Sequence, residues 1–212
     1  MTQERPHPRL TREESQAQTR ERLVQAARRL FARQGYGGAS IRDIAQEAGY
    51  SQGAFYSNFA SKEAVLLELL RRHMGEEVAH LTAALDPAGN GGDDGGTDDP
   101  LAGIRRWSET LNADADWSML AIELQLNARR SPAFAADYAA VCDGHRAALG
   151  RLIGQLFVRL GRVPPAPPDD LAAAFMALAQ GLALHNPGGG PHPAGRMILV
   201  FLRGLIADAA PA

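Results

Sequence analysis

Apolar residues recur every three or four positions along most of the chain, and no segment shows the sustained alternation of apolar and polar residues that marks a half-buried strand. The clearest case is residues 61–85, where Val65, Leu66, Leu69 and Leu70 begin an apolar stripe. At 1.5 Å per residue a helix over this segment would extend for about 37 Å, which is long enough to join two domains. The pattern predicts an all-α fold.

Further helices are expected on both sides of this long one. A first helix begins near Ser15 and ends at Gly35, because glycine is a common terminator of helices. After residue 100 the apolar period predicts helices over residues 101–112, 117–130, 132–161, 169–186 and 194–209.

Two segments carry no helical signal. Residues 1–15 are polar and contain proline, and we interpret them as a flexible basic arm. Residues 86–100 contain five glycines, five aspartates and almost no apolar residue. Such a composition cannot offset its ordering entropy by burial, so we expect a mobile loop there.

Residues 40–59 have the spacing of a helix-turn-helix. Ser40, Ser51 and Ser61 each precede a short helical segment and are expected to be N-caps. The first segment is apolar at Ile41, Ile44, Ala45 and Ala48, a glycine turn follows at Gly49, and Phe55 and Phe59 anchor the second segment. The residues then left to face outward are Gln52, Gly53, Tyr56, Ser57 and Asn58. Such a small, hydrogen-bonding set fits close contact with a DNA groove, although an ordinary two-helix corner with a polar outer face has the same pattern.

Charge is distributed unevenly along the chain. Residues 1–75 carry twelve Lys and Arg against eight Asp and Glu, a net of +4, whereas residues 76–212 carry ten against sixteen, a net of −6, which together give the overall −2. Lys62 is the single lysine, and it stands at the start of the long helix, where a cation opposes the helix dipole. A phosphate bound at that helix end would explain this position, and Arg42 in the first turn of its own helix presents the same case.

Three linked motifs in this region resemble those of a known family. They are AA..LF....GY from Ala26 to Tyr36, S..DIA..AG from Ser40 to Gly49, and S.G.FY..F.SK from Ser51 to Lys62. Their unbroken spacing over residues 16–76 closely resembles the DNA-binding domain of the TetR family of bacterial transcriptional regulators. The resemblance implies that the helix over residues 51–58 enters the major groove of DNA. Two departures are Tyr50, where a small aliphatic residue is usual, and Asn58, where His or Tyr is common; both make the preferred bases unguessable.

The resemblance also assigns residues to DNA contact. It implies that Tyr56 and Lys62 contact phosphates and that Ser40 lies near the DNA backbone. With the outward residues identified above, the predicted DNA-binding set is Ser40, Arg42, Ser51, Gln52, Gly53, Tyr56, Ser57, Asn58 and Lys62.

For residues 77–212 the resemblance implies a helical domain for ligand binding and dimerisation. The last two expected helices are apolar on more than one face, which fits either a monomer core or a subunit interface equally well. The resemblance favours the interface, in a homodimer on a pseudo-palindromic operator. The expected interface residues are Phe175, Met176, Ala179, Ala183, Met197, Val200, Phe201 and Gly204.

A ligand pocket is expected among the middle helices, whose large apolar or amphipathic residues are candidate contacts. These candidates are Trp107, Leu111, Trp117, Met119, Phe134, Tyr138 and Phe157, and most of them are expected to be ordinary core. No obvious charged cluster accompanies them, which favours a largely hydrophobic or aromatic effector. Repression is the family's commoner mode of action and is the mode we expect, with activation as the alternative.

Two other classes of protein were weighed against a DNA-binding regulator. An enzyme would need a catalytic constellation, and the nearest is Cys142 with His145, a pair too small for a metal site and without a phosphate loop or nucleophile motif elsewhere. His185 and His192 bracket a glycine turn and have equally little support as metal ligands. The second class is a dimeric ligand carrier that retains the domain only as a scaffold. We expect no enzyme activity, no cofactor and no metal.

The compartment follows from what the sequence contains. A single cysteine allows no intrachain disulfide, which is compatible with a reducing cytosol. The first fifteen residues have no apolar segment of an export signal, and the longest apolar runs fall short of the ~20 residues that span a bilayer. We expect a cytoplasmic protein with no membrane partner.

Overall fold

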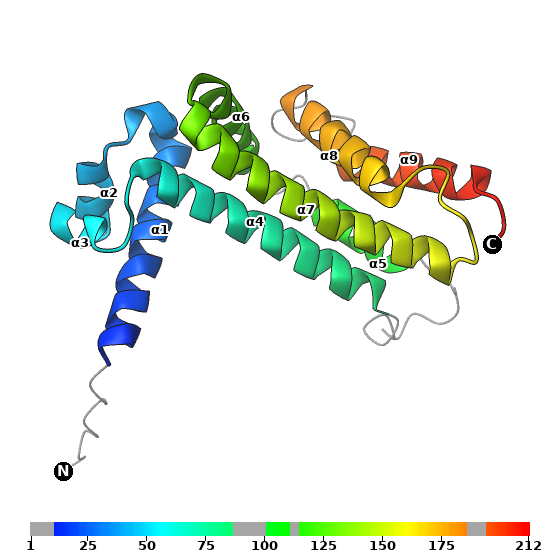
Figure 1. Cartoon of the computed structure of the whole chain (residues 1–212), viewed down its shortest axis with the longest axis horizontal. Helices are drawn as coiled ribbons and strands as arrows, with labels where there is room; N and C mark the ends of the chain where they lie inside the picture. Colours follow the sequence, from blue (N-terminus) through cyan, green and yellow to red (C-terminus); the bar gives the residue numbers. More distant parts are fainter. Residues whose placement is uncertain (1–10, 87–100, 111–114, 186–193) are drawn as a thin grey trace, which may run out of the picture. The chain divides into compact units, whose positions relative to one another are not determined.

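The computed structural model describes residues 11–86, 101–110, 115–185 and 194–212, and within these ranges it is helical apart from turns and one isolated bridge between Arg162 and Pro211 (Figure 1). The all-α prediction is therefore confirmed. The chain divides into two compact units between Leu69 and Leu70, a boundary that falls inside one long helix. Each unit is described separately.

The first unit contains α1 (Arg12–Gly38), α2 (Ile41–Glu47), α3 (Gln52–Tyr56) and the first residues of α4 (Lys62–Leu85). α1 begins earlier than expected, because Thr11 and Glu14 form a capping box. The Thr11 N–H donates to Glu14 Oε2 at 2.7 Å, and the Glu14 N–H donates to Thr11 Oγ1 at 3.2 Å. A flexible arm extending to residue 15 is therefore wrong for residues 12–15, and residues 1–10 lie outside the described part.

The other end of α1 falls close to the prediction. Gly35 has a φ of 71°, a left-handed conformation that interrupts the helix, and one further turn carries it to Gly38. Ser40 and Ser51 are N-caps as expected: each hydroxyl accepts the backbone N–H three residues on, from Asp43 and Ala54.

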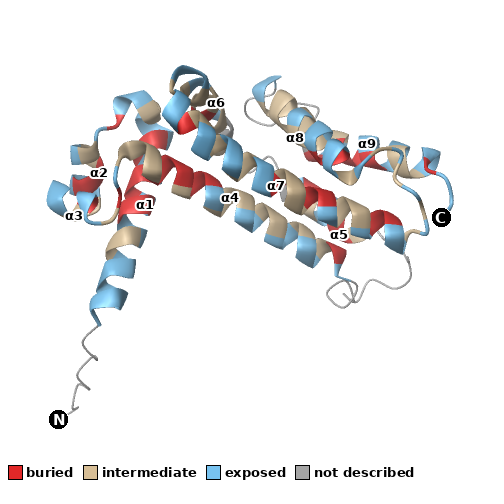
Figure 2. Ribbon diagram, in the orientation of Figure 1, coloured by how far each residue is buried: buried red, intermediate tan, exposed pale blue. Residues whose placement is uncertain are grey.

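The core of the first unit lies where α1, α2 and α3 meet the beginning of α4, as the buried residues in Figure 2 show. Phe55 is 0% exposed and Phe59 4%, so both anchor α3 as predicted. The other buried side chains include Leu23, Val24, Ala27, Leu30, Phe31, Ile44, Ala45, Val65, Leu66 and Leu69.

The second unit contains the rest of α4 together with α5 (Ala102–Thr110), α6 (Ala115–Arg130), α7 (Pro132–Arg159), α8 (Pro168–His185) and α9 (Ala194–Asp208). Each of the helices α5 to α9 agrees with its expected range to within two residues at either end. The mobile loop expected over residues 86–100 lies outside the described residues except for Asp86.

Buried side chains from several helices form the core of the second unit. Leu85 of α4, Ile104 of α5, Leu156 of α7 and Leu199 of α9 belong to one cluster. Helices approach closely beside it: a Cβ added at Gly103 would overlap the Ala84 carbonyl, so only glycine fits there. Within the described ranges, no helix combines the length and apolar character that a membrane span requires.

Candidate nucleic-acid interface

α2 begins with a reciprocal cap between Ser40 and Asp43. The Asp43 N–H donates to Ser40 Oγ at 3.2 Å, and the Ser40 N–H donates to Asp43 Oδ2 at 3.1 Å. The Ser40 hydroxyl also donates to Oδ2 at 2.6 Å, and these bonds from Ser40 hold the pKa of the Asp43 carboxyl below its usual range. Ser40 is exposed, and Arg42 beside it is exposed in the first turn of α2. The cap fixes the start of α2, where both residues lie.

α3 presents a polar face whose direction follows from its buried anchor. Because Phe55 is fully buried, the residues around it point away from the unit: Gln52, Gly53 and Ser57 are exposed, and Tyr56 is 58% exposed. The Ser57 hydroxyl donates back to the Gly53 carbonyl at 2.9 Å, so its oxygen lone pairs remain the outward-facing group. The face combines an amide, two hydroxyls and an open stretch of backbone.

Asn58 does not belong to that face, which corrects the sequence prediction. Its Nδ2 donates to the Ala54 carbonyl at 2.8 Å, and its own carbonyl accepts a 2.8 Å bond from Arg20 Nη1. The side chain is partly buried, with an Oδ1 that has no hydrogen-bond partner within the described part of the chain. α3 also ends at Tyr56, so the helix is shorter than the predicted 51–58, and Asn58 lies beyond it.

Arg20 is the residue that sequence reasoning missed. Its guanidinium lies 4.1 Å from the centroid of the Phe59 ring and pairs with Glu68 at 3.1 Å, besides holding the Asn58 carbonyl. One signal was available: Arg20 precedes Leu23 by three positions and therefore continues the buried stripe of α1. It positions the segment that follows α3.

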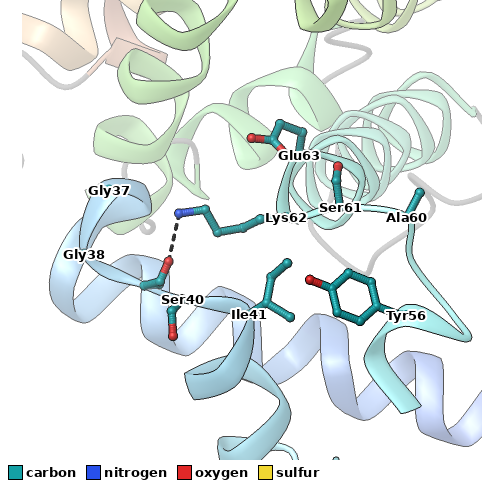
Figure 3. A pocket seen from close by; sticks show the side chains of 10 residues that line it. Gly37, Gly38, Ser40, Ile41, Tyr56, Ala60, Ser61, Lys62 and Glu63 are labelled. Atoms are coloured by element: carbon teal, nitrogen blue, oxygen red, sulfur yellow. Dashed lines mark hydrogen bonds between the residues drawn. The ribbon is translucent and has the colours of Figure 1, made fainter. Parts of the chain in front are cut away.

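Lys62 has partners that the sequence argument did not foresee. Its Nζ donates to the carbonyls of Tyr36 and Ala39, at 2.8 Å in each case, and lies 4.1 Å from the centroid of the Tyr36 ring. Figure 3 shows the ammonium group directed at the turn between α1 and α2. A bound phosphate is therefore not required to explain a cation here, because carbonyls at the end of α1 accept hydrogen bonds from it. That Lys62 contacts phosphate remains a prediction.

A hollow of about 490 Å³ opens between the end of α1, α3 and the start of α4 (Figure 3). Ser40, Tyr56 and Ser61 bring hydroxyl groups to its lining, and the first N–H groups of α4 are close by. Glu63, which also lines it, accepts a hydrogen bond from the Tyr36 hydroxyl, and burial together with that bond raises the pKa of Tyr36. Hydroxyls and helix-terminal N–H groups are suitable donors for a phosphate oxygen.

Several arginines of α1 are engaged within the unit. Arg29 and Arg33 both pair with Glu47, at 3.1 and 3.2 Å, and these contacts lower the pKa of the Glu47 carboxyl. The pairs join α1 to α2, but they leave the excess of positive charge in this part of the chain unchanged.

The predicted ligand contacts are distributed over different environments in the second unit. Phe134 and Phe157 are 4% and 0% exposed and are core residues, whereas Met119 is 60% exposed. Trp117 stacks on His73 with ring centroids 3.9 Å apart, and Trp107 packs against the core cluster containing Leu85. Tyr138 stacks on Phe134 at 6.1 Å, and Leu111 lies outside the described residues. Helical period alone could not separate these environments, because it fixes the face of a helix and not what packs on it.

The predicted interface residues lie in three different environments. Phe175 packs against the core cluster of its own unit, so assigning it to an interface is not supported. Val200 and Phe201 are 54% and 53% exposed, Leu184 at the end of α8 is 54% exposed, and Gly204 is also exposed. The remaining four, Met176, Ala179, Ala183 and Met197, are partly buried.

Cys142 and His145 have separate partners. Burial raises the pKa of the Cys142 thiol, whose side chain interacts with Tyr138, while His145 Nε2 lies 3.2 Å from Glu77 Oε2. A raised thiol pKa disfavours the thiolate that a nucleophile or metal ligand requires.

The arrangement of α2, the glycine turn and α3 defines the class of domain. A short helix braces a second one, whose exposed polar face is held by buried aromatic residues; this is a helix-turn-helix of the DNA-binding type. Residues 23–69 match the family model described as bacterial regulatory proteins, tetR family. Residues 23–69, which contain the helix-turn-helix, are therefore similar to this family.

Named relatives match part of the chain. The HTH-type transcriptional regulator YerO of Bacillus subtilis is 45% identical over 56 residues, which cover 26% of this chain and 19% of the relative. The HTH-type transcriptional repressor AcnR of Corynebacterium glutamicum is 28% identical over 128 residues, covering 59% of this chain and 60% of AcnR. The chain thus spans less than two thirds of either relative.

Solved structures extend the similarity of fold to nearly the whole chain. A TetR-family regulator from Mesorhizobium loti has a TM-score of 0.69 at 18% identity, covering 95% of this chain and all of the other. Salmonella enterica GusR has a TM-score of 0.71 at 19% identity, with coverage of 94% and 100%. A regulator from Saccharomonospora viridis in complex with choline has a TM-score of 0.64 at 23% identity, with coverage of 92% and 99%.

Proposed function

We propose that this protein is a transcriptional repressor that binds a pseudo-palindromic DNA operator as a homodimer and is released from it by a small-molecule effector. In this proposal residues 16–76 bind DNA, residues 77–212 bind the effector and form the dimer, and the protein acts in the cytoplasm. The observation that carries it is the exposed polar face of α3, fixed by the fully buried Phe55 and the adjacent Arg20.

The proposed DNA contacts fall into two chemical classes. Gln52 carries an amide, which can bond an adenine edge in a bidentate fashion, so we assign it to base recognition. Hydroxyls and cations suit phosphates, so Ser40, Arg42, Ser51, Tyr56, Ser57 and Lys62 are assigned to the DNA backbone. Lys62 is assigned to phosphate contact although its Nζ also donates to two backbone carbonyls. Because these bonds hold the end of α1 against the start of α4, Lys62 also helps to form the site.

Dimerisation is supported by the exposed apolar side chains of α8 and α9. Two recognition helices in a dimer would reach half-sites about one DNA turn, or ~34–36 Å, apart. Effector binding that shifts α4 would change this separation, and a coupling of about 1–3 kcal/mol alters DNA affinity by roughly 5- to 150-fold. The repressor names of relatives such as AcnR support repression over activation.

The direct test is a mobility-shift assay with intergenic DNA from beside the protein's own gene. A specific complex that weakens steeply as salt rises is expected, because phosphate contacts release counterions. If no salt-sensitive shift is seen, the regulator proposal is wrong and the alternative of a dimeric ligand carrier is favoured. Transcription in vitro from the bound promoter then separates repression from activation.

A base-preference experiment tests the assignment of Gln52. Gln52→Ala should change the ranking of operator variants, with a loss of about 1–3 kcal/mol in discrimination at one base pair. Arg42→Ala is the matched control, and it should weaken all operator variants about equally and reduce the salt dependence. If both substitutions altered the ranking in the same way, the division into base and phosphate contacts would be wrong.

A further inference from the structure

A groove of about 420 Å³ lies between α4 and α7 in the second unit, two helices that run side by side in Figure 1. Its apolar wall is formed by Met74 and Val78 from α4 and by Val141 and Ala148 from α7. The volume is within the range of about 300–1,000 Å³ that is usual for small-molecule sites. Among the described residues, none of the ligand contacts predicted from sequence lines it.

His145, one of the residues that line this groove, has an unsatisfied polar atom. The residue is 7% exposed and lines the groove, and its Nε2 lies 3.2 Å from Glu77 Oε2. A carboxylate only accepts hydrogen bonds, so Nε2 carries a hydrogen, and in the tautomer protonated there alone Nδ1 is an acceptor. Nδ1 is buried and has no hydrogen-bond partner among the described residues. Buried polar atoms are normally paired, so this one indicates a missing donor.

Arg71 supplies the charge at the other end. It is exposed, and no acidic side chain is among the described residues that line the groove. Arg71 precedes Glu77, the partner of His145, by six residues on α4, which corresponds to about 9 Å along the helix. The groove therefore has a cation towards one end, a hydrogen-bond acceptor near Glu77 and an apolar surface between them.

We propose that this groove binds a small amphipathic carboxylic acid that carries a hydroxyl group at its far end. Arg71 binds the carboxylate, the apolar body lies over Met74, Val78 and Val141, and the hydroxyl donates to His145 Nδ1. This inference rests on the proposed function as an effector-released regulator, and it makes the effector an organic acid where the sequence favoured a largely hydrophobic molecule.

Calorimetric titration of the full chain with a graded set of probes tests the class of ligand. The probes are 4-hydroxybenzoate, 4-hydroxyphenylacetate and 4-hydroxycinnamate, which differ in the distance between carboxylate and hydroxyl. The best of them should lose about tenfold or more in affinity when the hydroxyl is removed, and again when the acid is replaced by its methyl ester. Absence of saturable binding by all three acids, or equal affinity for acid, ester and dehydroxylated acid, overturns the proposal.

Filling the groove tests the location. A Cβ added at Gly144, which lines the groove on α7, meets no atom within 4 Å, so the first carbon of a side chain fits there, and Gly144→Leu should fill the groove and abolish binding of the acid. Ala136→Leu, at an exposed position of α7 that is not among the groove residues, is the matched control and should bind as the unmodified protein does. Unchanged affinity in Gly144→Leu places the ligand elsewhere and overturns the proposal.

Charge removal tests the role of Arg71. Arg71→Gln should weaken the acid by about tenfold or more while leaving the weak binding of the methyl ester unchanged. Arg151→Gln, an exposed arginine of α7, is the control and should have no effect on either compound. A similar loss for acid and ester in Arg71→Gln would contradict the assignment of the carboxylate.

These titrations contain no DNA, so they separate the two proposals. If the acids bind as expected and no DNA is shifted, the groove proposal is supported and the proposal of a DNA-binding regulator is contradicted. If DNA is shifted and no acid binds, the regulator stands and the groove assignment falls.

Discussion

Lys62 shows how far a single residue can be interpreted from its neighbours in sequence. Its position at the start of α4 is visible in the sequence, and the unfavourable helix dipole there is a valid inference. The carbonyls that receive its ammonium group belong to Tyr36 and Ala39, which are 26 and 23 positions earlier in the chain. No local pattern indicates that pairing, because it depends on how α1 ends against α4.

The Lys62 contacts predict a loss of folding stability as well as a loss of DNA binding. Lys62→Ala should lower the free energy of unfolding by about 1–2 kcal/mol, since it removes charge-assisted hydrogen bonds to two backbone carbonyls. Urea unfolding measures this effect. Arg42→Ala, at an exposed site, should change stability by less than about 0.5 kcal/mol. Equal stability of both variants would mean that the carbonyl contacts are not formed in solution.

Substitution of Gly53 should have opposite effects on folding stability and on DNA binding. A Cβ at this position would meet only Ser51 Oγ, at an ordinary 3.6 Å, so the fold itself does not require glycine. Gly53→Ala should therefore stabilise α3 by up to about 1 kcal/mol while weakening DNA binding, because the methyl group holds the backbone away from the groove. Thermal unfolding and a mobility-shift assay on the same preparation measure the two effects. Gly181→Ala, in the open interior of α8, should stabilise without changing DNA affinity.

At the scale of elements, the sequence specified helices well where a cap accompanied the apolar period. The N-cap at Ser40 and the glycine at Gly35 both appear where they were expected. The start of α1 was missed although Thr11 and Glu14 carry a capping-box spacing, because the segment before them is polar and was interpreted as an arm. α3 was expected to be longer, since sequence period alone does not show that Asn58 turns back to Ala54.

The cap of α2 predicts a pH-dependent contribution to stability. Hydrogen bonds from Ser40 lower the pKa of Asp43 in the folded protein relative to the unfolded chain. The carboxylate therefore stabilises the fold above the unfolded pKa, and this contribution is lost as the pH falls through the lowered folded pKa. Asp43→Asn should be less stable than the unmodified protein at neutral pH, and the difference should disappear in acid.

Thermal unfolding of both proteins across this pH range checks the prediction. Asp137→Asn, at an exposed position of α7, is a suitable control and should follow the unmodified protein throughout. A stability difference for Asp43→Asn that stayed constant into strong acid would show that the cap does not depend on ionisation.

At the scale of the whole chain, the sequence predicted an all-α protein with a helix-turn-helix near its beginning, and the helices after residue 100 fell close to their expected ranges. The site residues of the second unit were harder to assign. Phe157 and Met119 were both candidate ligand contacts, yet the first is fully buried and the second 60% exposed. Burial depends on which helices pack together, and that information is not contained in the period of any one helix.

The proposed homodimer makes the last prediction. Val200 and Phe201 of α9 are each more than half exposed, and apolar side chains of this size in water favour a covered surface. The double variant Val200→Glu, Phe201→Glu should be monomeric in analytical ultracentrifugation, because two charges per subunit cannot be buried without partners. Val158→Glu is the matched control: Val158 of α7 is 77% exposed but lies outside the predicted interface. On the full operator the monomer should bind far more weakly, while its affinity for a half-site should match that of the control. A dimer that persists in the double variant would move the interface away from this face of α9.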